Sequence, residues 1–285
     1  MQWSGRRLLD RFRVIEHEAR FDVDLTRALL GGDEEAPCVA YVVRNAVDRD
    51  HCERFAANFW DIIERRGSFR VNDGAVEVSQ VGATQYSFAS DEYLARSTRT
   101  RDDVDGLFHG LGDGGREQIL REELFSSLLA DTGLAFRPAG YRRSVVNPCA
   151  ARSWKNTGAF SLEPHEDAAQ LAIARRDGFE IGEARNVVSA VVVATDAHGG
   201  GELRMWDWAP DDEARAALAL AETGYPYPAE ITERFPSVEI ATRAGDFVLL
   251  RGEFVHAVNP TSRPGRVSVS RFIGRIETGE VVYWT

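Results

Sequence analysis

The triplet His165-Glu166-Asp167 contains two side chains that bind metal ions well, an imidazole and a carboxylate. Residues i and i+2 of an extended segment project to the same side, so His165 and Asp167 would point together while Glu166 faces away. The triplet alone is a weak signal, because a chain with 6 histidines can match His-x-Asp by chance. A metal site requires a further ligand elsewhere in the chain.

His256 is the natural third ligand. It ends an apolar, β-branched and aromatic run that begins at Gly245, and we predict one buried strand over this run. Two imidazoles and one carboxylate form the facial triad that binds Fe(II) and leaves coordination positions open. Those positions suit a bidentate 2-oxo acid and dioxygen, so His165, Asp167 and His256 predict an iron site.

Arg266 and Ser268 provide the groups that such an acid needs at its far end. The segment Asn259 to Gly265 is rich in turn formers, so we predict a hairpin that returns along a strand beginning at Arg266. On this strand Arg266, Ser268 and Ser270 share one face. A guanidinium binds a carboxylate with two parallel hydrogen bonds, and a hydroxyl adds another. The pattern therefore predicts a 2-oxoglutarate site beside the iron.

Each of these residues also has a simpler interpretation. His165 alone could be a hydrogen-bonded polar residue, His256 a surface imidazole at a strand end, and Arg266 an ion-pair partner for any acid. The joint agreement of order, spacing and strand parity favours the metal site. The rival triplet His51-Cys52-Glu53 lies in a helical pattern, where residues i and i+2 diverge, so we do not assign it as a ligand set.

Apolar periodicity predicts the elements that must position these residues. Helical spacing predicts helices from Asp50 to Arg66 and from Glu117 to Ala130. The stretch from Arg99 to Gly115, rich in Asp and Gly, is predicted to be an exposed loop or lid. Strands are expected at 37–43, 142–146, 159–162, 187–195, 201–208, 237–241, 247–256, 266–273 and 281–284.

The short strands that follow Tyr141 fit a double-stranded β-helix, a cupin-like jelly-roll barrel whose mouth can hold a metal. The predicted fold class is therefore α+β and mainly β, with helices that flank this core. A hairpin is expected to turn at His198-Gly199-Gly200. An insertion from Pro210 to Phe235, with a short helix after its acidic residues, could cover the pocket.

Four side chains are candidates for the substrate pocket. Trp154, Phe160 and Trp206 are aromatic residues that could lie near it, although aromatic residues more often fill a core. Arg152 could contact an anionic substrate or 2-oxoglutarate itself. An amino acid, a dipeptide, an alkaloid and a carrier-bound acyl chain all remain open as substrates.

With these motifs in place, the chain resembles the Fe(II)/2-oxoglutarate-dependent dioxygenase superfamily, most strongly in its C-terminal half. Within it, the chain is similar to the group that contains the freestanding aliphatic halogenases of indole-alkaloid biosynthesis. The halogenases of that group have a small residue at the position of Asp167, which opens a coordination site for chloride. The resemblance is carried by Gly200-Gly201-Glu202-Leu203, Gly245-Asp246 and its strand, His256, Arg266 and Val282-Tyr283-Trp284.

The carboxylate of Asp167 implies a hydroxylase instead, with Fe(II) as cofactor and 2-oxoglutarate and dioxygen as cosubstrates. The implied reaction hydroxylates an aliphatic C–H of a small molecule, an amino acid or a natural-product intermediate, and releases succinate and CO2. Desaturation, cyclisation or epimerisation at the same site is one alternative. Another is a non-redox, cupin-like barrel that binds a metal or a sugar and forms no succinate.

Composition narrows the class of protein. A chain of 285 residues fits a single dioxygenase domain, with helical support and lid elements in 1–140 and the metal-binding jelly-roll core in 141–285. The net charge of −11, without a basic patch, disfavours nucleic-acid binding. No membrane-spanning apolar stretch and no export signal occurs, which predicts a cytoplasmic protein. The 3 cysteines predict reduced thiols, and a monomer and a homodimer both remain open.

Overall fold

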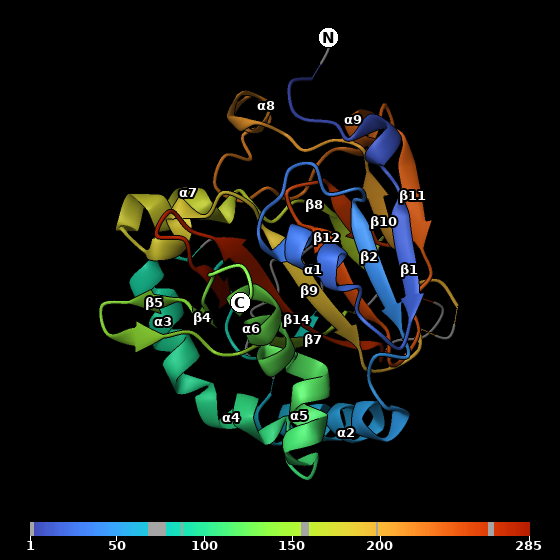
Figure 1. Cartoon of the computed structure of the whole chain (residues 1–285), viewed down its shortest axis with the longest axis vertical. Helices are drawn as coiled ribbons and strands as arrows, with labels where there is room; N and C mark the ends of the chain where they lie inside the picture. The colour runs from blue at the N-terminus through green and yellow to red at the C-terminus, as the bar shows by residue number, and fades with distance from the viewer. Residues whose placement is uncertain (1–2, 68–77, 87, 155–159, 198, 262–264) are drawn as a thin grey trace.

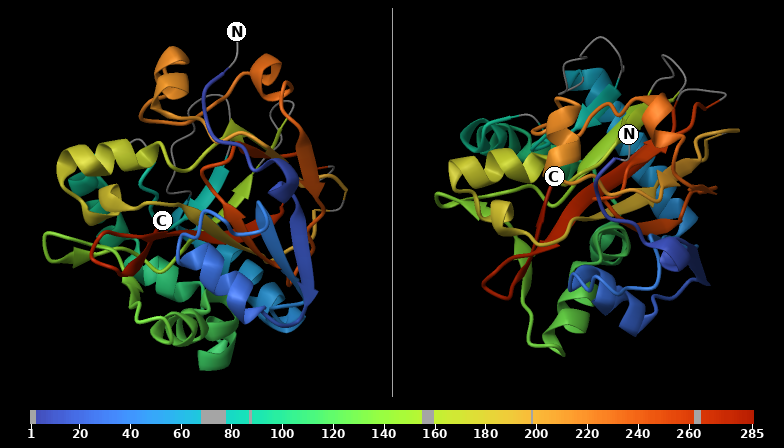
Figure 2. Two further views of the ribbon diagram at one scale, coloured as in Figure 1. Left: turned by 45° about the horizontal axis from the view of Figure 1, so that its top comes forward. Right: turned by 90° about the horizontal axis from the view of Figure 1, so that it is seen from above.

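The computed structural model describes residues 3–67, 78–86, 88–154, 160–197, 199–261 and 265–285. Two β-sheets pack on each other, and helices cover the outer face of the larger one (Figure 1, Figure 2). Sheets joined in this way form a jelly-roll. The predicted fold class, a mainly β core with flanking helices, is confirmed.

Within the described ranges, the larger sheet has nine strands, antiparallel except at the β1–β2 and β15–β4 pairs. β7 (Ala150–Trp154) pairs with β14 and carries β3 (Val78–Val81) on its other edge. The N-terminal part of the chain therefore adds strands to the core sheet. The main order is β1 (Val14–Glu18), β2 (Ala40–Arg44), β12 (Phe247–Arg251), β9 (Val188–Val193), β14 (Val267–Arg275), β15 (Val281–Trp284) and β4 (Phe136–Pro138).

The smaller sheet packs against the larger one through a shared apolar cluster. Leu203 and Met205 belong to this cluster from one sheet, and Val248 and Leu250 belong to it from the other. In the residues described, this sheet has four antiparallel strands, β11 (Ser237–Ile240), β10 (Leu203–Trp206), β13 (His256–Val258) and β8 (Leu162–His165). A separate short hairpin consists of β5 (Gly140–Tyr141) and β6 (Ser144–Val145).

The helices up to residue 177 bury apolar faces in the core of the larger sheet, whereas those at 212–217 and 229–232 belong to a separate apolar cluster with the smaller sheet. Phe55 and Phe59 of α2 and Phe125 and Leu129 of α6 join one core with its strands. Figure 1 shows α2, α4 and α5 at one end of the molecule and α8 and α9 at the other. Among the described helices, none has the length and apolar character needed to cross a bilayer. The helices are α1 (Val23–Leu30), α2 (Arg49–Arg66), α3 (Ser90–Arg99), α4 (Arg101–Gly106), α5 (Gly112–Leu120), α6 (Glu122–Ala130), α7 (Gln170–Asp177), α8 (Asp212–Ala217) and α9 (Ala229–Thr232), with 3₁₀ segments at Leu9–Arg11 and Glu180–Glu183.

Two helix predictions have different outcomes. The helix predicted from Asp50 to Arg66 is confirmed as α2. The single helix predicted from Glu117 to Ala130 is wrong, because Arg121 has a φ of 53° and divides it into α5 and α6. The Glu117 carboxylate accepts two backbone N–H groups in the first turn of α6 and so stabilises its start.

The loop or lid predicted from Arg99 to Gly115 is also wrong. This stretch contains α4 and the start of α5, and Val104, Leu107 and Leu111 are buried in the core that includes α2. Their spacing of about three to four residues is helical, but the surrounding Asp and Gly residues obscured it. All of 99–115 is described, and none of it lines the pocket that contains His165, Asp167 and His256.

Three predicted strand connections differ from the structure. The strand predicted to run unbroken to His256 is two strands, since the chain turns at Gly252 and passes from β12 to β13 in the other sheet. The hairpins predicted at 198–200 and 259–265 are wrong, because each would join a strand of one sheet to a strand of the other. His198 and residues 262–264 lie outside the described residues. Strands of a jelly-roll pass between two sheets, and local turn signals do not reveal this.

The insertion between β10 and β11, residues 207–236, forms hydrogen bonds with the end of β8, the strand that contains His165. Two backbone hydrogen bonds, of 3.0 and 2.8 Å, align residues 224–227 with residues 164–166. The Glu166 side chain is fully buried and accepts a hydrogen bond from Arg215 Nε at 2.8 Å. Because Arg215 belongs to α8, a buried ion pair ties the insertion to the barrel.

Replacing Arg215 with Met should destabilise the protein by about 3–5 kcal/mol, because the buried Glu166 charge loses its partner. Arg176→Met is the matched control. Arg176 forms an exposed ion pair with Glu222 of the same insertion, and its loss should cost less than about 1 kcal/mol. Denaturant unfolding of both variants measures the two values. If both variants lose the same free energy of unfolding, the buried ion pair does not hold the insertion in place.

Candidate active site

The three predicted metal ligands converge from two paired strands. His165 ends β8, Asp167 follows it, and His256 begins β13 directly opposite His165. His256 Nε2 lies 3.4 Å from Asp167 Oδ2, and His165 Nε2 lies 3.9 Å from Asp167 Oδ1. One ligand atom from each residue lies within 4.8 Å of the others, so these residues could hold one metal ion.

Backbone carbonyls orient both imidazoles. Nδ1 of His165 lies 2.8 Å from the Glu163 carbonyl oxygen, and Nδ1 of His256 lies 2.8 Å from that of Phe254. A carbonyl oxygen only accepts, so Nδ1 donates, and a neutral imidazole then directs its Nε2 lone pair toward the Asp167 carboxylate. Electron-pair donors that face one another repel unless a cation lies among them. The donor set therefore fits a metal ion of the Fe(II) type.

Two hydrogen bonds, one to the carboxylate and one from the backbone N–H, fix the position of Asp167. Ser189 Oγ donates to Asp167 Oδ2 at 2.5 Å, and the Asp167 N–H donates to the Gly252 carbonyl at 2.7 Å. A Cβ at Gly252 would lie 2.7 Å from both Asp167 Oδ2 and the Ser189 hydroxyl, so a larger residue at this turn would displace one of these groups. Burial raises the pKa of the Asp167 carboxyl, whereas His256 lowers it. A bound cation would likewise favour the ionised form.

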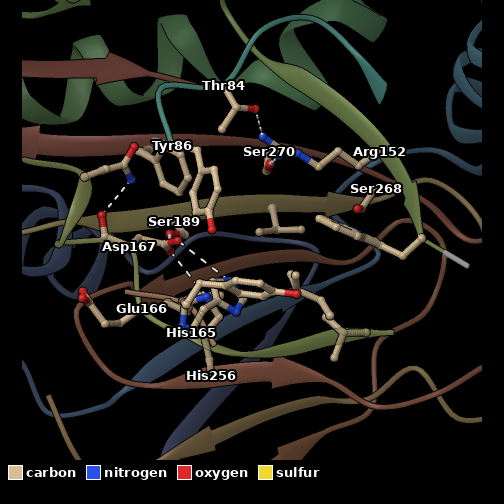
Figure 3. A pocket seen from close by; sticks show the side chains of 18 of the residues that line it. Thr84, Tyr86, Arg152, His165, Glu166, Asp167, Ser189, His256, Ser268 and Ser270 are labelled. Carbon is tan, nitrogen blue, oxygen red and sulfur yellow. Dashed lines mark hydrogen bonds and ion pairs between the residues drawn. The ribbon is translucent and has the colours of Figure 1, made fainter. Parts of the chain in front are cut away.

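The three residues line a pocket with an empty volume of about 1040 Å³, its mouth included. Figure 3 shows His165 and His256 on one side of the pocket and Thr84, Arg152 and Ser270 on the other. Much of the remaining wall is apolar or aromatic and is formed by Tyr86, Trp154, Leu162, Val191, Tyr225, Leu250, Val258 and Phe272.

Arg266, which directly precedes β14, and Ser268 of that strand also line this pocket, on the side that strand alternation indicated. Arg266 donates from Nη1 to the Gly201 carbonyl at 2.8 Å and from Nη2 to the Thr242 hydroxyl at 3.0 Å. Its buried Nε has no hydrogen-bond partner among the described residues. Burial lowers the pKa of Arg266 to about 10, so it remains cationic at neutral pH. A buried cation with an unused donor fits a carboxylate ligand.

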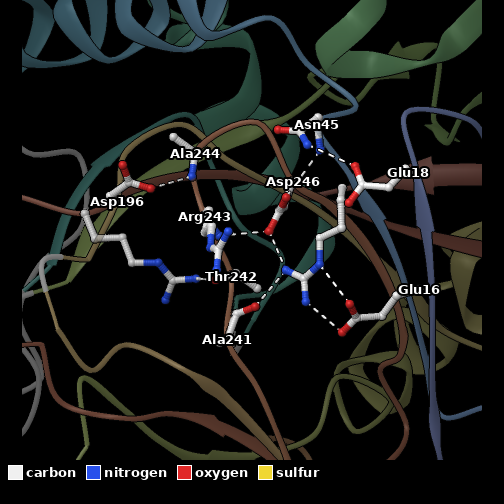
Figure 4. A network of polar contacts seen from close by, with 11 residues as sticks. Glu16, Glu18, Asn45, Asp196, Ala241, Thr242, Arg243, Ala244 and Asp246 are labelled. Atoms are coloured by element: carbon white, nitrogen blue, oxygen red, sulfur yellow. Dashed lines mark hydrogen bonds and ion pairs between the residues drawn. The ribbon is translucent and has the colours of Figure 1, made fainter.

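A polar network fixes Thr242, the hydroxyl partner of that arginine (Figure 4). Asp246 accepts the N–H of Arg243 at 2.9 Å and a hydrogen bond from Arg44 at 2.6 Å. Arg44 also donates to the Ala241 carbonyl at 2.7 Å. The chain is thus held on both sides of Thr242, which keeps its hydroxyl in place.

The four candidates for the substrate pocket separate into two groups. Arg152 and Trp154 line the pocket from β7. Phe160 and Trp206 are not among the residues that line it; they belong to another apolar cluster, in which their rings lie 6.3 Å apart. Met205 belongs to the cluster between the sheets, so its neighbour on β10, Trp206, points the opposite way.

Sequence reasoning missed several residues of the site. Ser189 interrupts an otherwise apolar strand, and that lone hydroxyl is the signal that could have found it. Thr84 and Tyr86 follow β3, whereas Thr223 and Tyr225 belong to the insertion, and all four line the pocket. No local pattern marks them, because long-range packing brings them to the site.

Protein-family models give no match to the chain. The chain is 33% identical over 247 residues to an L-isoleucine 3(1)-dioxygenase of Pantoea ananatis (strain AJ13355). That match covers 87% of this chain and 83% of the Pantoea protein.

Among solved structures, the fold is similar to that of an N-substituted L-amino acid dioxygenase from Burkholderia ambifaria AMMD, with a TM-score of 0.53 and 15% identity. The complex of that enzyme with α-ketoglutarate gives a TM-score of 0.50 and 17% identity. Each match covers 92% of this chain and 91% of the other. At these identities the likeness shows the fold alone. The Pantoea relative shows the family, and the converged triad is consistent with it: the chain belongs to the Fe(II)/2-oxoglutarate-dependent dioxygenases, which use Fe(II), 2-oxoglutarate and dioxygen.

Proposed function

We propose that His165, Asp167 and His256 hold the Fe(II) of this dioxygenase and that Arg266 and Ser268 bind the far carboxylate of 2-oxoglutarate. The convergence of three electron-pair donors in a pocket that also contains a buried arginine supports the proposal. When bound, iron and 2-oxoglutarate supply the activation of dioxygen, and the 2-oxo acid is decarboxylated to succinate.

The surrounding residues orient the ligands and limit the access of water. The Glu163 and Phe254 carbonyls keep both imidazoles turned toward the carboxylate, while Ser189 holds one carboxylate oxygen. Val191 and Leu250 add apolar walls. Ligands held in place by a rigid shell need little reorganisation when the metal and the cosubstrate bind.

We propose that the reaction hydroxylates an aliphatic C–H of an amino acid. The Pantoea relative is named an L-isoleucine dioxygenase, and the apolar walls of this pocket suit an aliphatic side chain. Hydroxylation is the favoured outcome because a carboxylate occupies position 167. The aliphatic halogenases that the sequence resembles have a small residue at this position, and their halogenation depends on it.

Anaerobic addition of 2-oxoglutarate to the Fe(II)-loaded protein should produce the weak visible charge-transfer band of a chelated 2-oxo acid. Succinate release in air, measured with a panel of aliphatic L-amino acids, then identifies the substrate, and its product should gain the mass of one oxygen atom. Bound iron without the band would contradict the assignment of 2-oxoglutarate to this pocket.

Asp167→Gly should abolish hydroxylation, because the carboxylate ligand is lost, while the two imidazoles can still retain iron. Iron content and the mass of the product measure the two effects separately, and added chloride tests whether the vacated position accepts it. His51→Ala, which removes the histidine of the rival triplet, should leave iron content and product unchanged. Full hydroxylase activity in Asp167→Gly would remove this residue from the ligand set.

Arg266→Gln should weaken 2-oxoglutarate binding by about 2–4 kcal/mol, because a buried, charged contact is lost. Titration of the charge-transfer band gives the dissociation constant. Arg275→Gln is the matched control, since Arg275 lies at the other end of β14 and does not line the pocket. The same constant in Arg266→Gln and the unmodified protein would mean that another residue binds the far carboxylate.

A further inference from the structure

Ser189 of β9 lies between two large apolar side chains of the pocket. Its register partner on β12 is Leu250, and its register partner on β14 is Phe272. Side chains that pair directly on neighbouring strands share a face and have Cβ atoms about 4.5–5.5 Å apart. All three residues line the pocket. Because Ser189 also donates to the Asp167 carboxylate, this proposed metal ligand has Leu250 on one side and Phe272 on the other.

Leu250 and Phe272 differ in what they offer to a substrate. Leu250 is 2% exposed and belongs to the apolar cluster between the two sheets. Phe272 is partly exposed, so its ring presents a surface to the pocket. Its partner on β15, Trp284, is fully buried, and the two ring centroids lie 5.9 Å apart. Since Trp284 Nε1 donates to Gln170 Oε1 at 3.4 Å, a fixed indole supports the phenyl ring on the side away from Ser189.

The pocket face of β14 changes from polar to apolar along the strand. Two serines come first, on the side of Arg266, and Phe272 and Gly274 follow. All of β14 is described, and Phe272 is its last residue that lines the pocket. A Cβ at Gly274 would lie 2.9 Å from the Ala184 Cβ and 3.1 Å from the Trp284 ring, so this part of the strand is closely packed. The pocket therefore extends from Arg266, at the proposed cosubstrate end, to an apolar end at Phe272.

We propose that Phe272 forms the end wall of the substrate site and limits the substrate to amino acids with an aliphatic side chain. This inference rests on the proposed function and deepens it, because it names the residue that sets the size of the substrate. An aliphatic C–H presented to the metal ligands would bring its side chain between Asp167 and the Phe272 ring. A branched aliphatic group packs well on a phenyl face. An aromatic side chain needs the volume that the phenyl ring occupies, and a close-packed wall does not yield to it.

The test uses the whole protein, loaded anaerobically with Fe(II) and 2-oxoglutarate and titrated by calorimetry with L-valine, L-leucine, L-isoleucine and L-phenylalanine. At least one aliphatic amino acid should bind the unmodified protein about 10-fold or more tightly than L-phenylalanine does. Phe272→Ala should raise the affinity for L-phenylalanine by about 10-fold or more, because the missing ring leaves space for the aromatic side chain. The same variant should bind the aliphatic amino acid more weakly, since its packing surface is lost. Phe272→Leu should shift the preference in the same direction by a smaller factor.

Phe160→Ala is the matched control, because Phe160 is also partly exposed but packs against another apolar cluster and does not line the pocket. Its affinities for all four amino acids should equal those of the unmodified protein. The charge-transfer band should persist in both Phe272 variants with the same 2-oxoglutarate affinity, which separates the substrate end of the pocket from the cosubstrate end. Phe272→Leu decides the question if Phe272→Ala does not fold.

Three results would overturn the inference. One is an unchanged preference between aliphatic and aromatic amino acids in the Phe272 variants. Another is loss of the band, or of affinity for all four amino acids alike, in these variants alone, because such a residue only maintains the packing of β14. The third is an unmodified protein that shows the band but binds L-phenylalanine as tightly as the aliphatic amino acids, or binds none of the four. Absence of the band from the unmodified protein would instead refute the proposed function, and this inference with it.

Discussion

The buried carboxylate of Asp167 joins the two sheets, and the geometry of the whole site depends on it. Asp167 follows β8 of the smaller sheet, accepts a hydrogen bond from Ser189 on β9 of the larger sheet, and donates its N–H to Gly252 at the crossover between them. A buried carboxylate is costly unless hydrogen bonds and positive charge oppose it. Cation binding at this point is therefore linked to the packing of one sheet on the other.

The chemistry of the site could be predicted from the sequence because it obeys local rules. Side chains two apart on a strand share a face, which placed His165 with Asp167 and Arg266 with Ser268 on the basis of spacing alone. The fold class followed in the same way from the number and length of the strands. His256 lies beside His165 and Asp167 although the strand predicted to reach it was wrong, since only the end of that run had to be correct.

The remaining features depend on which strands pair, and no short stretch of sequence records that. β7 was missed although it carries Arg152, and two supposed hairpins join strands of different sheets. Trp206 was misplaced because its strand buries both faces, so an aromatic residue there fits either side. Helix α4 and the start of α5 were predicted as a loop because composition outweighed the spacing of Val104 and its apolar neighbours.

The manner in which the insertion is attached bears on how enzymes of this type acquire new substrates. Main-chain atoms, not side chains, form the hydrogen bonds that hold residues 224–227 beside residues 164–166. Thr223 and Tyr225 line the pocket from this segment, yet their side chains take no part in those two bonds. Either residue can therefore be exchanged during evolution without loss of those two bonds. Positions 223 and 225 are for the same reason suitable targets for a laboratory library that seeks new regioselectivity.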